Sequence, residues 1–261
     1  MLKYGDKIAI AISGGKDSLS LLNVLNEICT PHSTELHAIL IDEGIKDYRD
    51  EAIDITKDVV KKYNIPLSIV SYKELYGTTL DNALDWKNQR HISSCAICGP
   101  FRRRAIDVAA KKIGATVIAT GHNLDDYLQT YFINICNGDL DKITWLNPKN
   151  MYNENIRRVK PFLEISEHEI TLYAYFSKFP FQTSTCPYMN EGIRTQIRDF
   201  LKNLEQQHPG IQYSILKSAI SMSQNTPATS KTRLSCKKCG NISSSEICSV
   251  CNTLNLIKIN K

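Results

Sequence analysis

The sequence predicts an α/β fold in which a parallel sheet carries helices on both faces. Two observations lead to this prediction. Short apolar runs bounded by polar residues alternate with longer segments whose apolar residues recur at helical spacing. Polar, glycine-containing loops follow several of the apolar runs, and parallel sheets bind ligands at the carboxyl ends of their strands.

Four apolar runs are predicted to be buried strands, because each is short and bounded by polar residues. They are Lys7–Ile12, Leu36–Ile41, Leu67–Ser71 and Thr116–Thr120. The loops that follow three of them should converge on one pocket. These loops are Ser13–Ser18, Asp42–Gly44 and Gly121–Asp126.

Helices are predicted between and after these strands from the spacing of the apolar side chains. Pro100 is expected in the first turn of one helix, and Gly114 is expected to end it. Cys29 and Cys136 stand alone in helical patterns and are expected to be small buried hydrophobic residues. The predicted helices begin near Asp17 and then cover Asp47–Tyr63, Thr79–Gln89, Pro100–Ile113, Gly121–Cys136, Glu167–Phe179, Asn190–Gln206 and Ile211–Gln224.

The chain is predicted to have three parts. Residues 1–225 form the α/β domain, whose C-terminal part is helical. Residues 226–235 have the composition of a linker, and residues 236–261 form a small cysteine-rich module.

The composition is that of an ordinary globular protein, with 42% hydrophobic and 23% charged residues. No apolar run approaches the roughly 18–20 residues that span a bilayer, and the first residues lack a signal region. We therefore expect a cytoplasmic protein without a membrane partner. The net charge of +5 is concentrated between Arg90 and Lys112 and between Lys231 and Lys261. These basic patches suggest a polyanionic partner, with a solvated surface as the alternative.

The loop Ser13–Ser18, with the sequence SGGKDS, is predicted to bind phosphate. Two glycines allow a tight turn after the strand, and the N–H groups at the start of the next helix favour an anion. Lys16 adds a cation, Ser13 and Ser18 add hydroxyl donors, and Asp17 would sit near magnesium or the helix start. The GxxxxGK[ST] pattern of other nucleoside triphosphatases is not present, so a GTPase or motor site is not expected.

Cys95 and Cys98 form a CxxC pair, which Cys186 could join through the fold. In a reducing compartment such pairs suggest metal rather than disulfides. Three thiolates suit a [4Fe–4S] cluster in which one iron lacks a protein ligand. Three alternatives remain. The cysteines could bind zinc, they could form a catalytic dithiol that makes a persulfide with Cys186 as the resolving thiol, or they could be unrelated to one another.

Six parts of the chain carry a resemblance to a known family. They are SGGKDS (Ser13–Ser18), CAICGPFRRRAID (Cys95–Asp107), ATGHNLDDYLQT (Ala119–Thr130), VKPF (Val159–Phe162), TCPY (Thr185–Tyr188) and the terminal cysteines. Together they resemble the tRNA 2-thiouridine synthetases of the archaeal and eukaryotic cytoplasmic type, which are PP-loop ATP pyrophosphatases with an adenine nucleotide alpha hydrolase-like fold. SGGKDS alone indicates only that superfamily. The FRR run after CxxCG resembles the branch that modifies the wobble uridine, since the T-loop branch usually has Lys in place of Arg102.

The resemblance implies a tRNA-uridine 2-sulfurtransferase. ATP would adenylate the oxygen on ring carbon 2 of uridine, pyrophosphate would leave, and sulfur would then displace AMP. The resemblance places a [4Fe–4S] cluster with an open iron for sulfur on Cys95, Cys98 and Cys186. It places Asp126 at the reacting centre, although capping of a helix start is the alternative for Asp125 and Asp126. ATP with Mg is implied to bind at Ala11, Ser13, Gly14, Gly15, Lys16, Asp17, Ser18, Arg102, Gly121 and Asp126.

The implied partners are tRNA, a second copy of the chain in a homodimer, and either sulfide or a ubiquitin-like sulfur carrier. Family members usually begin with an additional N-terminal zinc module, whereas here the first predicted strand begins almost at once. We therefore expect tRNA recognition, and the dimer surface with it, to differ from the family pattern.

Four cysteines in two CxxC pairs close the sequence, and this spacing predicts a tetrahedral zinc site. Gly240 allows the turn that such a site needs. The module is expected to stabilise the chain end, to contact tRNA through Lys237 and Lys238, or both. The zinc ligands are Cys236, Cys239, Cys248 and Cys251.

Two other functions remain open at the level of sequence. A tRNA 2-thiocytidine synthetase also combines a PP-loop with a CxxC pair and a third cysteine, but the CxxCG sequence and the terminal module argue against it. A non-enzymatic iron–sulfur or zinc RNA-binding protein is the second alternative, and the intact phosphate loop argues against it.

Overall fold

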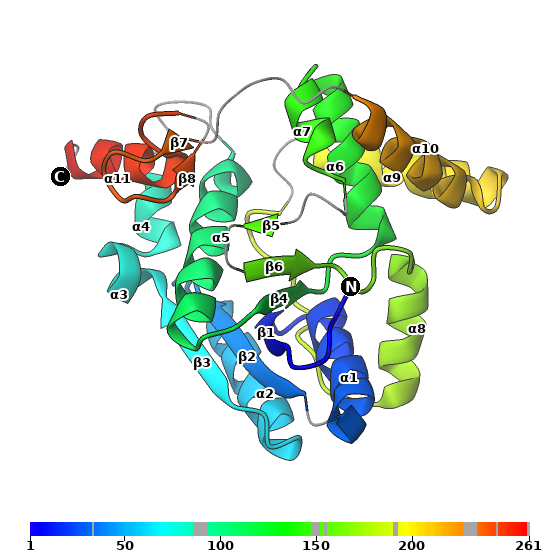
Figure 1. The fold of residues 1–261 in the computed structure, drawn as a ribbon, viewed down its shortest axis with the longest axis horizontal. Helices are drawn as coiled ribbons and strands as arrows, with labels where there is room; N and C mark the ends of the chain where they lie inside the picture. The colour runs from blue at the N-terminus through cyan, green and yellow to red at the C-terminus, as the bar shows by residue number, and fades with distance from the viewer. Residues whose placement is uncertain are drawn as a thin grey trace.

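A six-stranded sheet forms the centre of the molecule (Figure 1). The computed structural model describes residues 1–32, 34–85, 93–147, 152–153, 156–189, 193–226, 234–243 and 245–259. The strand order is β3-β2-β1-β4-β6-β5, and all neighbours are parallel except β5, which pairs antiparallel with β6. The strands are β1 (Lys7–Ile12), β2 (Glu35–Asp42), β3 (Leu67–Ser71), β4 (Val117–Thr120), β5 (Tyr152–Asn153) and β6 (Ile156–Val159). The predicted parallel sheet is confirmed.

The winding direction of the sheet switches between β1 and β4. The chain winds from β1 outward through β2 and β3, and then returns to place β4 and β6 on the other side of β1. Near the carboxyl end of β1, Ala11 lies between Ile39 of β2 and Thr120 of β4. Ligands of parallel sheets bind in the crevice at such a switch point, so the loops after β1 and β4 flank the expected site.

Alternation along β1 explains why both faces of the sheet are covered. Ile8, Ile10 and Ile12 pack with α1, α2 and α8, whereas Ala9 packs with α5 and the short helices beside it. Helices therefore lie on both faces, as the sequence predicts (Figure 1). These helices are α1 (Lys16–Cys29), α2 (Arg49–Lys62), α3 (Tyr72–Tyr76), α4 (Leu80–Asp85), α5 (Ser94–Lys112) and α8 (Glu167–Ser177), and a 3-10 turn (Thr30–His32) follows α1.

A helical layer with its own core adjoins the sheet. Leu124, Tyr127 and Leu128 form its centre together with Leu201 and Leu216. In Figure 1 this layer lies at the upper right, and the red C-terminal module lies at the upper left. Its helices are α6 (Leu124–Cys136), α7 (Leu140–Thr144), α9 (Arg194–Gln207) and α10 (Ile211–Asn225).

The C-terminal module packs against α5. Its elements are β7 (Leu234–Ser235), β8 (Ile242–Ser243) and α11 (Ser249–Ile259), and the two strands pair antiparallel. Cys236, Cys248 and Cys251 are buried in the same apolar cluster as Phe101 and Ala105 of α5. The module and the CxxC pair are therefore joined through one helix.

The start of α5 differs from the prediction. The helix begins at Ser94 rather than at Pro100, so Cys95 and Cys98 lie in its first turns. The Ser93 side chain accepts the N–H of Ala96 at 3.3 Å and caps the helix earlier. The cap and the burial of Ile97, Cys98 and Phe101 offset the hydrogen bond that Pro100 lacks.

The two isolated cysteines differ in their burial. Cys29 is buried as expected, but Cys136 is exposed because it ends α6 on the solvent side. Strand β6 was missed because its sequence, IRRV, carries two arginines. Parts of the predicted helices at residues 86–89 and 190–192 lie outside the described residues. No helix among the described residues is long and apolar enough to span a membrane.

Candidate functional site

The loop after β1 is held by its own serine side chains. Ser18 Oγ accepts the N–H of Ser13 at 3.1 Å and donates to the carbonyl of Gly15 at 3.0 Å. The Ser13 hydroxyl lies 3.1 Å from Ser18 Oγ. Gly15 is the N-cap of α1 and has no side chain to cap the helix, so the first N–H groups of α1 remain available to an anion.

Two glycines let neighbouring segments approach this loop. Gly14 has φ of +86°, and a Cβ there would lie 2.6 Å from Cβ of Ala52 on α2. Gly121, after β4, comes so close to the start of α1 that a Cβ would lie 2.9 Å from the carbonyl oxygen of Asp17. The loops after β1 and β4 therefore meet, as their positions in the sequence predict.

Charged side chains surround the start of α1. Lys16 Nζ lies 3.0 Å from Asp17 Oδ1 and 3.1 Å from Glu167 Oε1 at the start of α8. Burial raises the pKa of Asp17 against the opposing effect of Lys16, and Asp126 and Glu167 raise it further. Three carboxylates thus share one region, with Lys16 as the cation that the phosphate loop contributes.

The two neighbouring aspartates of the GHNLDD segment have different roles. Asp125 accepts the N–H of Glu167 at 2.7 Å and the side-chain amide of Gln212 at 3.3 Å, so it joins α6 to α8 and α10. Asp126 forms a capping box with Asn123, in which each side chain accepts the other residue's N–H. The capping alternative is therefore observed for Asp126, while burial in the crevice and the charge of Glu167 raise the pKa of its carboxyl.

Several cations lie near His122, and two of them, Lys160 and Arg194, also lie near Asp126. Desolvation and the neighbouring cations Lys160, Arg102, Arg194 and Arg103 lower the pKa of His122. The ring is therefore neutral at neutral pH, and its Nδ1 lies 2.9 Å from the hydroxyl of Thr120. Burial likewise lowers the pKa of Lys160. The region around His122 therefore offers positive charge to an incoming anion.

The three cysteines of the predicted cluster site come together from two segments. Cys95 and Cys98 lie on α5, and Cys186 lies in the segment before α9. Burial raises the pKa of Cys186, and the charges of Cys98 and Cys95 raise it further, so the three thiols lie near one another. Burial also raises the pKa of Cys98, and Arg102 opposes this effect.

The Cys186 segment is attached to the phosphate loop. The N–H of Gln182 donates to the carbonyl of Gly14 at 2.9 Å, and its side-chain amide donates to the carbonyl of Tyr48 at 2.6 Å. Ser184 donates to Glu51 on α2 at 2.9 Å. The segment that leads to Cys186 is therefore attached both to the phosphate loop and to α2.

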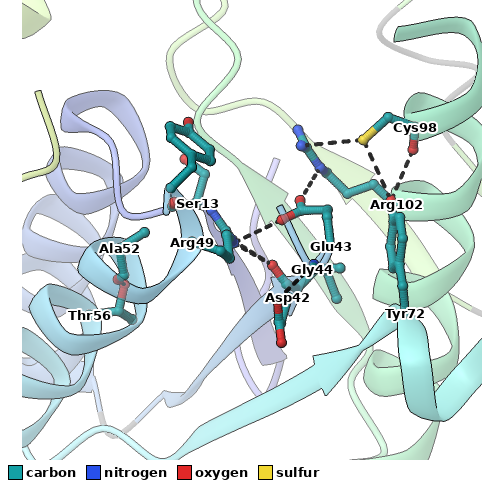
Figure 2. A network of polar contacts seen from close by, with 12 residues as sticks. Ser13, Asp42, Glu43, Gly44, Arg49, Ala52, Thr56, Tyr72, Cys98 and Arg102 are labelled. Atoms are coloured by element: carbon teal, nitrogen blue, oxygen red, sulfur yellow. Dashed lines mark hydrogen bonds and ion pairs between the residues drawn. The ribbon is translucent and has the colours of Figure 1, made fainter. Parts of the chain in front are cut away.

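A second chain of contacts joins the loop to Cys98 (Figure 2). Arg49 donates to the carbonyl of Ser13 at 2.8 Å, and its Nε lies 2.8 Å from Glu43 Oε2. Glu43 Oε1 lies 2.7 Å from Arg102 Nε, and Arg102 Nη2 lies 3.5 Å from Cys98 Sγ. Tyr72 donates to the carbonyl of Cys98 at 3.1 Å from the buried side of α5. The sequence predicted Arg102 as a phosphate contact but did not identify Glu43 or Arg49.

The terminal cysteines form a compact group of their own. The sulfur atoms of all four lie within 4.8 Å of one another. The N–H of Cys248 donates to Cys236 Sγ at 3.3 Å, and Gly240 has φ of +72° in the turn between the first pair and β8. Arg104 of α5 donates to the sulfur atoms of Cys248 and Cys251 at 3.6 Å each. Such N–H···S contacts suit sulfur atoms that carry negative charge. The four cysteines are Cys236, Cys239, Cys248 and Cys251.

Cys95, Cys98 and Cys186 do not form an equally compact group. Among the described residues, the terminal four are the group of three or more potential metal ligands whose ligand atoms all lie within 4.8 Å of one another. Four thiolates around one ion must lie close together, whereas each thiolate of a cluster binds a different iron. A compact set of ligands for a single ion is therefore present at the terminal cysteines, and the cluster remains a prediction for the other three.

The fold and the phosphate loop define a PP-loop ATP-binding protein. The family model described as a PP-loop domain matches residues 3–205. Cytoplasmic tRNA 2-thiolation protein 1 of Oryza sativa subsp. japonica is 37% identical over 257 residues, which cover 96% of this chain and 69% of the relative. The protein of the same name from Laccaria bicolor is 37% identical over 260 residues, or 97% of this chain and 73% of the relative. The chain belongs to this family of tRNA thiolation proteins.

A solved structure agrees with this assignment. The U34-tRNA thiolase NcsA from Methanococcus maripaludis, described with its [4Fe-4S] cluster, matches with a TM-score of 0.84 and 33% identity. The match covers 97% of this chain and 81% of NcsA. The resemblance that the sequence motifs indicated is thus confirmed over nearly the whole chain.

Sequence reasoning missed the side chains that position the named residues. Glu43, Arg49 and Gln182 act through contacts between segments that are far apart in the sequence. The signal for Glu43 was its place after β2, in a loop expected to reach the pocket. Gln182 and Arg49 belong to no pattern that identifies them.

Proposed function

We propose that this chain is a tRNA-uridine 2-sulfurtransferase that acts on the wobble uridine. The hydrogen bond from Gln182 to Gly14 carries this proposal, because it holds the segment of Cys186 against the loop that would bind ATP. The relatives, which are named tRNA 2-thiolation protein and U34-tRNA thiolase, support the substrate class. The tRNA 2-thiolation proteins are named cytoplasmic, which agrees with the expected location.

The ATP site is assigned to the crevice between the loops after β1 and β4. The N–H groups at the start of α1 and the Lys16 ammonium would hold the phosphates, since they offer fixed donors and a mobile cation. Asp17 and Asp126 are the carboxylates that would meet Mg, which accompanies ATP. The remaining contacts are assigned to Ala11, Ser13, Gly14, Gly15, Ser18, Arg102 and Gly121.

Cys95, Cys98 and Cys186 are the residues that would hold a [4Fe–4S] cluster. When bound, such a cluster with an open iron supplies a place for sulfur. The mixed burial of the three cysteines fits this task, because Cys98 is buried and Cys95 is exposed. Arg102, beside Cys98, would neutralise negative charge near the thiolates and contact the phosphate that links AMP to uridine.

The chemistry follows from the poor reactivity of a uridine carbonyl. In the first step, the uridine oxygen on carbon 2 forms a bond to the α-phosphorus of ATP, and the bond to pyrophosphate breaks. In the second step, sulfur bonds to carbon 2, and AMP leaves with the original uridine oxygen. Placing both steps in one crevice replaces a bimolecular encounter by positioning.

The tRNA backbone is assigned to the cationic region around His122 and to α9. Arg194, Arg198 and Lys202 recur every four residues and therefore lie on one face of that helix. Arg194 lies near His122 and Asp126, and Arg198 and Lys202 lie near Glu167. This face thus borders the ATP site, where phosphates next to the target uridine would lie.

The terminal cysteines are assigned to zinc. Their four sulfur atoms are close enough for one tetrahedral ion, and zinc is the usual occupant of sites with four cysteine ligands. Lys237 pairs with Glu246, and Lys238 donates to Asn255. We therefore assign the zinc site first to stabilising the module, and contact of the module with tRNA remains a prediction. The homodimer and the sulfur donor, sulfide or a ubiquitin-like carrier, also remain predictions.

The test is an anaerobic reaction of the purified chain with unmodified tRNA, ATP, Mg and sulfide. Mass spectrometry of the digested nucleosides should show 2-thiouridine that depends on ATP, with one AMP formed per sulfur incorporated. Formation of 2-thiocytidine would support the alternative substrate. Binding of tRNA without any thiolated nucleoside or AMP would support the non-enzymatic alternative.

A further inference from the structure

Glu43 is a buried carboxylate that the proposed reaction does not use. It follows β2 and is 1% exposed. Its two oxygens meet two different arginines, Arg102 at 2.7 Å and Arg49 at 2.8 Å (Figure 2). Burying a carboxylate is unfavourable unless it is paired. The sequence therefore keeps an unfavourable group at a point that lies between the phosphate loop and Cys98.

The two arginines depend on Glu43 to different degrees. Arg49 is buried and donates to backbone carbonyls through three nitrogens, twice to Ile41 and once to Ser13. The Nε–H of Arg49 is directed at the Ile41 carbonyl, so Glu43 Oε2 contacts Arg49 without receiving a hydrogen bond. Arg49 should therefore keep its place without the carboxylate.

Arg102 has fewer restraints. Its side chain is 45% exposed, and its remaining polar contact among the described residues is the 3.5 Å approach of Nη2 to Cys98 Sγ. A long, half-exposed side chain has considerable rotamer freedom. The ion pair with Glu43 thus fixes the position of Arg102 Nε. With Nε fixed, Nη2 of the same guanidinium is directed toward Cys98.

The backbone around Glu43 is anchored independently of its side chain. The carbonyl of Glu43 accepts the N–H of Leu80 at 2.7 Å, and Asp42 accepts the N–H of Gly44 at 2.8 Å. Gly44 has φ of +69°, and a Cβ there would lie 2.6 Å from Cγ2 of Thr79. A change of the Glu43 side chain should therefore leave the loop in place.

We propose that Glu43 is a positioning residue. It holds the Arg102 guanidinium at the place of the reacting phosphate and, through Arg49, fixes that place relative to the phosphate loop. This inference rests on the proposed function, because it assigns Glu43 a part in the same reaction. Among the described residues, the polar contacts of the Glu43 carboxylate are with Arg102 and Arg49, so its effect on the reaction would pass through Arg102.

The experiment compares the anaerobically purified Glu43→Gln, Arg102→Ala and double variants with the wild-type chain. We measure AMP release that depends on tRNA, ATP affinity, and iron per chain. Misplacement of a catalytic group by about 1 Å is enough for a loss of roughly 100-fold, so Glu43→Gln should lower turnover by about 10- to 100-fold. Its iron content should remain within about twofold of wild type, and its ATP affinity should fall by less than its turnover, because Arg102 is one of several assigned ATP contacts.

The double variant decides whether Glu43 acts through Arg102. If it does, the turnover of the double variant should lie within about threefold of the turnover of the slower single variant. Independent effects would instead multiply the two losses of turnover. Asp6→Asn is the matched control, since it removes a buried carboxylate from an arginine pair at the far end of β1 and should leave turnover unchanged. If Glu43→Gln does not fold, Glu43→Asp replaces it, because the shorter carboxylate cannot reach both arginines.

Wild-type turnover in Glu43→Gln, multiplicative losses in the double variant, or loss of ATP binding or iron in Glu43→Gln would overturn the inference. Absence of tRNA-dependent AMP release from the wild-type chain would instead contradict the proposed function. The two failures are therefore distinguishable.

Discussion

The N–H of Gln182 donates a 2.9 Å hydrogen bond to the carbonyl of Gly14. This contact joins residues that are 168 positions apart and holds the segment of Cys186 against the phosphate loop. A reaction that first activates uridine with ATP and then adds sulfur needs these two parts side by side. Arg49, Glu43 and Arg102 provide the corresponding connection to Cys98.

Gly14→Ala should abolish ATP binding. The new Cβ would lie 2.6 Å from Cβ of Ala52 and would also occupy a left-handed conformation. The strain alone costs about 1–3 kcal/mol, and the clash would displace the loop from α2. Gly138→Ala is the control, because Gly138 has φ of +63° but open space around it. Isothermal titration with ATP should show loss of binding in Gly14→Ala and unchanged binding in Gly138→Ala; equal affinities would contradict the close approach.

Glu51→Ala should loosen the Cys186 segment. The Glu51 carboxylate accepts from the Gln182 side-chain amide at 3.2 Å and from Ser184 at 2.9 Å. Without these bonds we expect iron to be released faster to a chelator, by roughly threefold to tenfold, since supporting contacts of metal sites typically contribute 10- to 100-fold in affinity. Glu35→Ala, which removes an ion pair with Lys7, should release iron at the wild-type rate.

The two cysteine groups should lose their metals independently. Cys186→Ser should lower iron per chain to near zero and leave zinc at about one ion per chain. Cys248→Ser should do the reverse and also lower the melting temperature, because Cys248 belongs to the core shared with α5. Elemental analysis of anaerobically purified protein measures both metals. Full iron and unchanged visible absorption in Cys186→Ser would contradict the assignment of the three cysteines.

Asp6 should make stability depend on pH. Burial alone would raise the pKa of Asp6, but bonds from Arg157, the Lys3 N–H and Thr116 lower it below the ordinary value of 3.8. A carboxyl whose pKa is lowered by folding stabilises the protein above the unfolded pKa and loses this effect as the pH falls through the folded pKa.

The Asp6→Asn variant should therefore be less stable than wild type by about 2 kcal/mol at pH 7. The difference should shrink as the pH falls below 3.8. Urea unfolding of both proteins from pH 7 to pH 2.5 measures the difference. A gap that stays constant over this range would show that Asp6 acts by packing rather than by charge.

Local patterns predicted most of the fold and the residues that bear the chemistry. Apolar runs indicated β1 to β4, and SGGKDS and CxxC placed the phosphate loop and the first two cysteines. The pattern failed where tertiary contacts overrode it. IRRV forms β6 although two arginines interrupt it, because Arg157 pairs with Asp6 and Arg158 pairs with Asp107. Pro100 lies inside α5 because burial of its neighbours outweighs one missing hydrogen bond.

The supporting residues of the site were harder to predict for a related reason. Glu43 and Arg49 are defined by contacts that form only after β2, α2 and α5 have packed. A single sequence contains no spacing rule for such contacts. The same holds for Gln182, whose bond to the phosphate loop involves its backbone N–H, a group that every residue except proline carries.

Transfer of oxygen from uridine to AMP tests the central claim most directly. An anticodon stem-loop labelled with ¹⁸O on carbon 2 of the target uridine is treated anaerobically with ATP, Mg, sulfide and the purified chain. If the phosphate loop adenylates that oxygen beside the three cysteines, mass spectrometry should find one ¹⁸O in each AMP and one sulfur in each converted uridine. Formation of 2-thiouridine with unlabelled AMP, or with ¹⁸O in pyrophosphate or water, would contradict it.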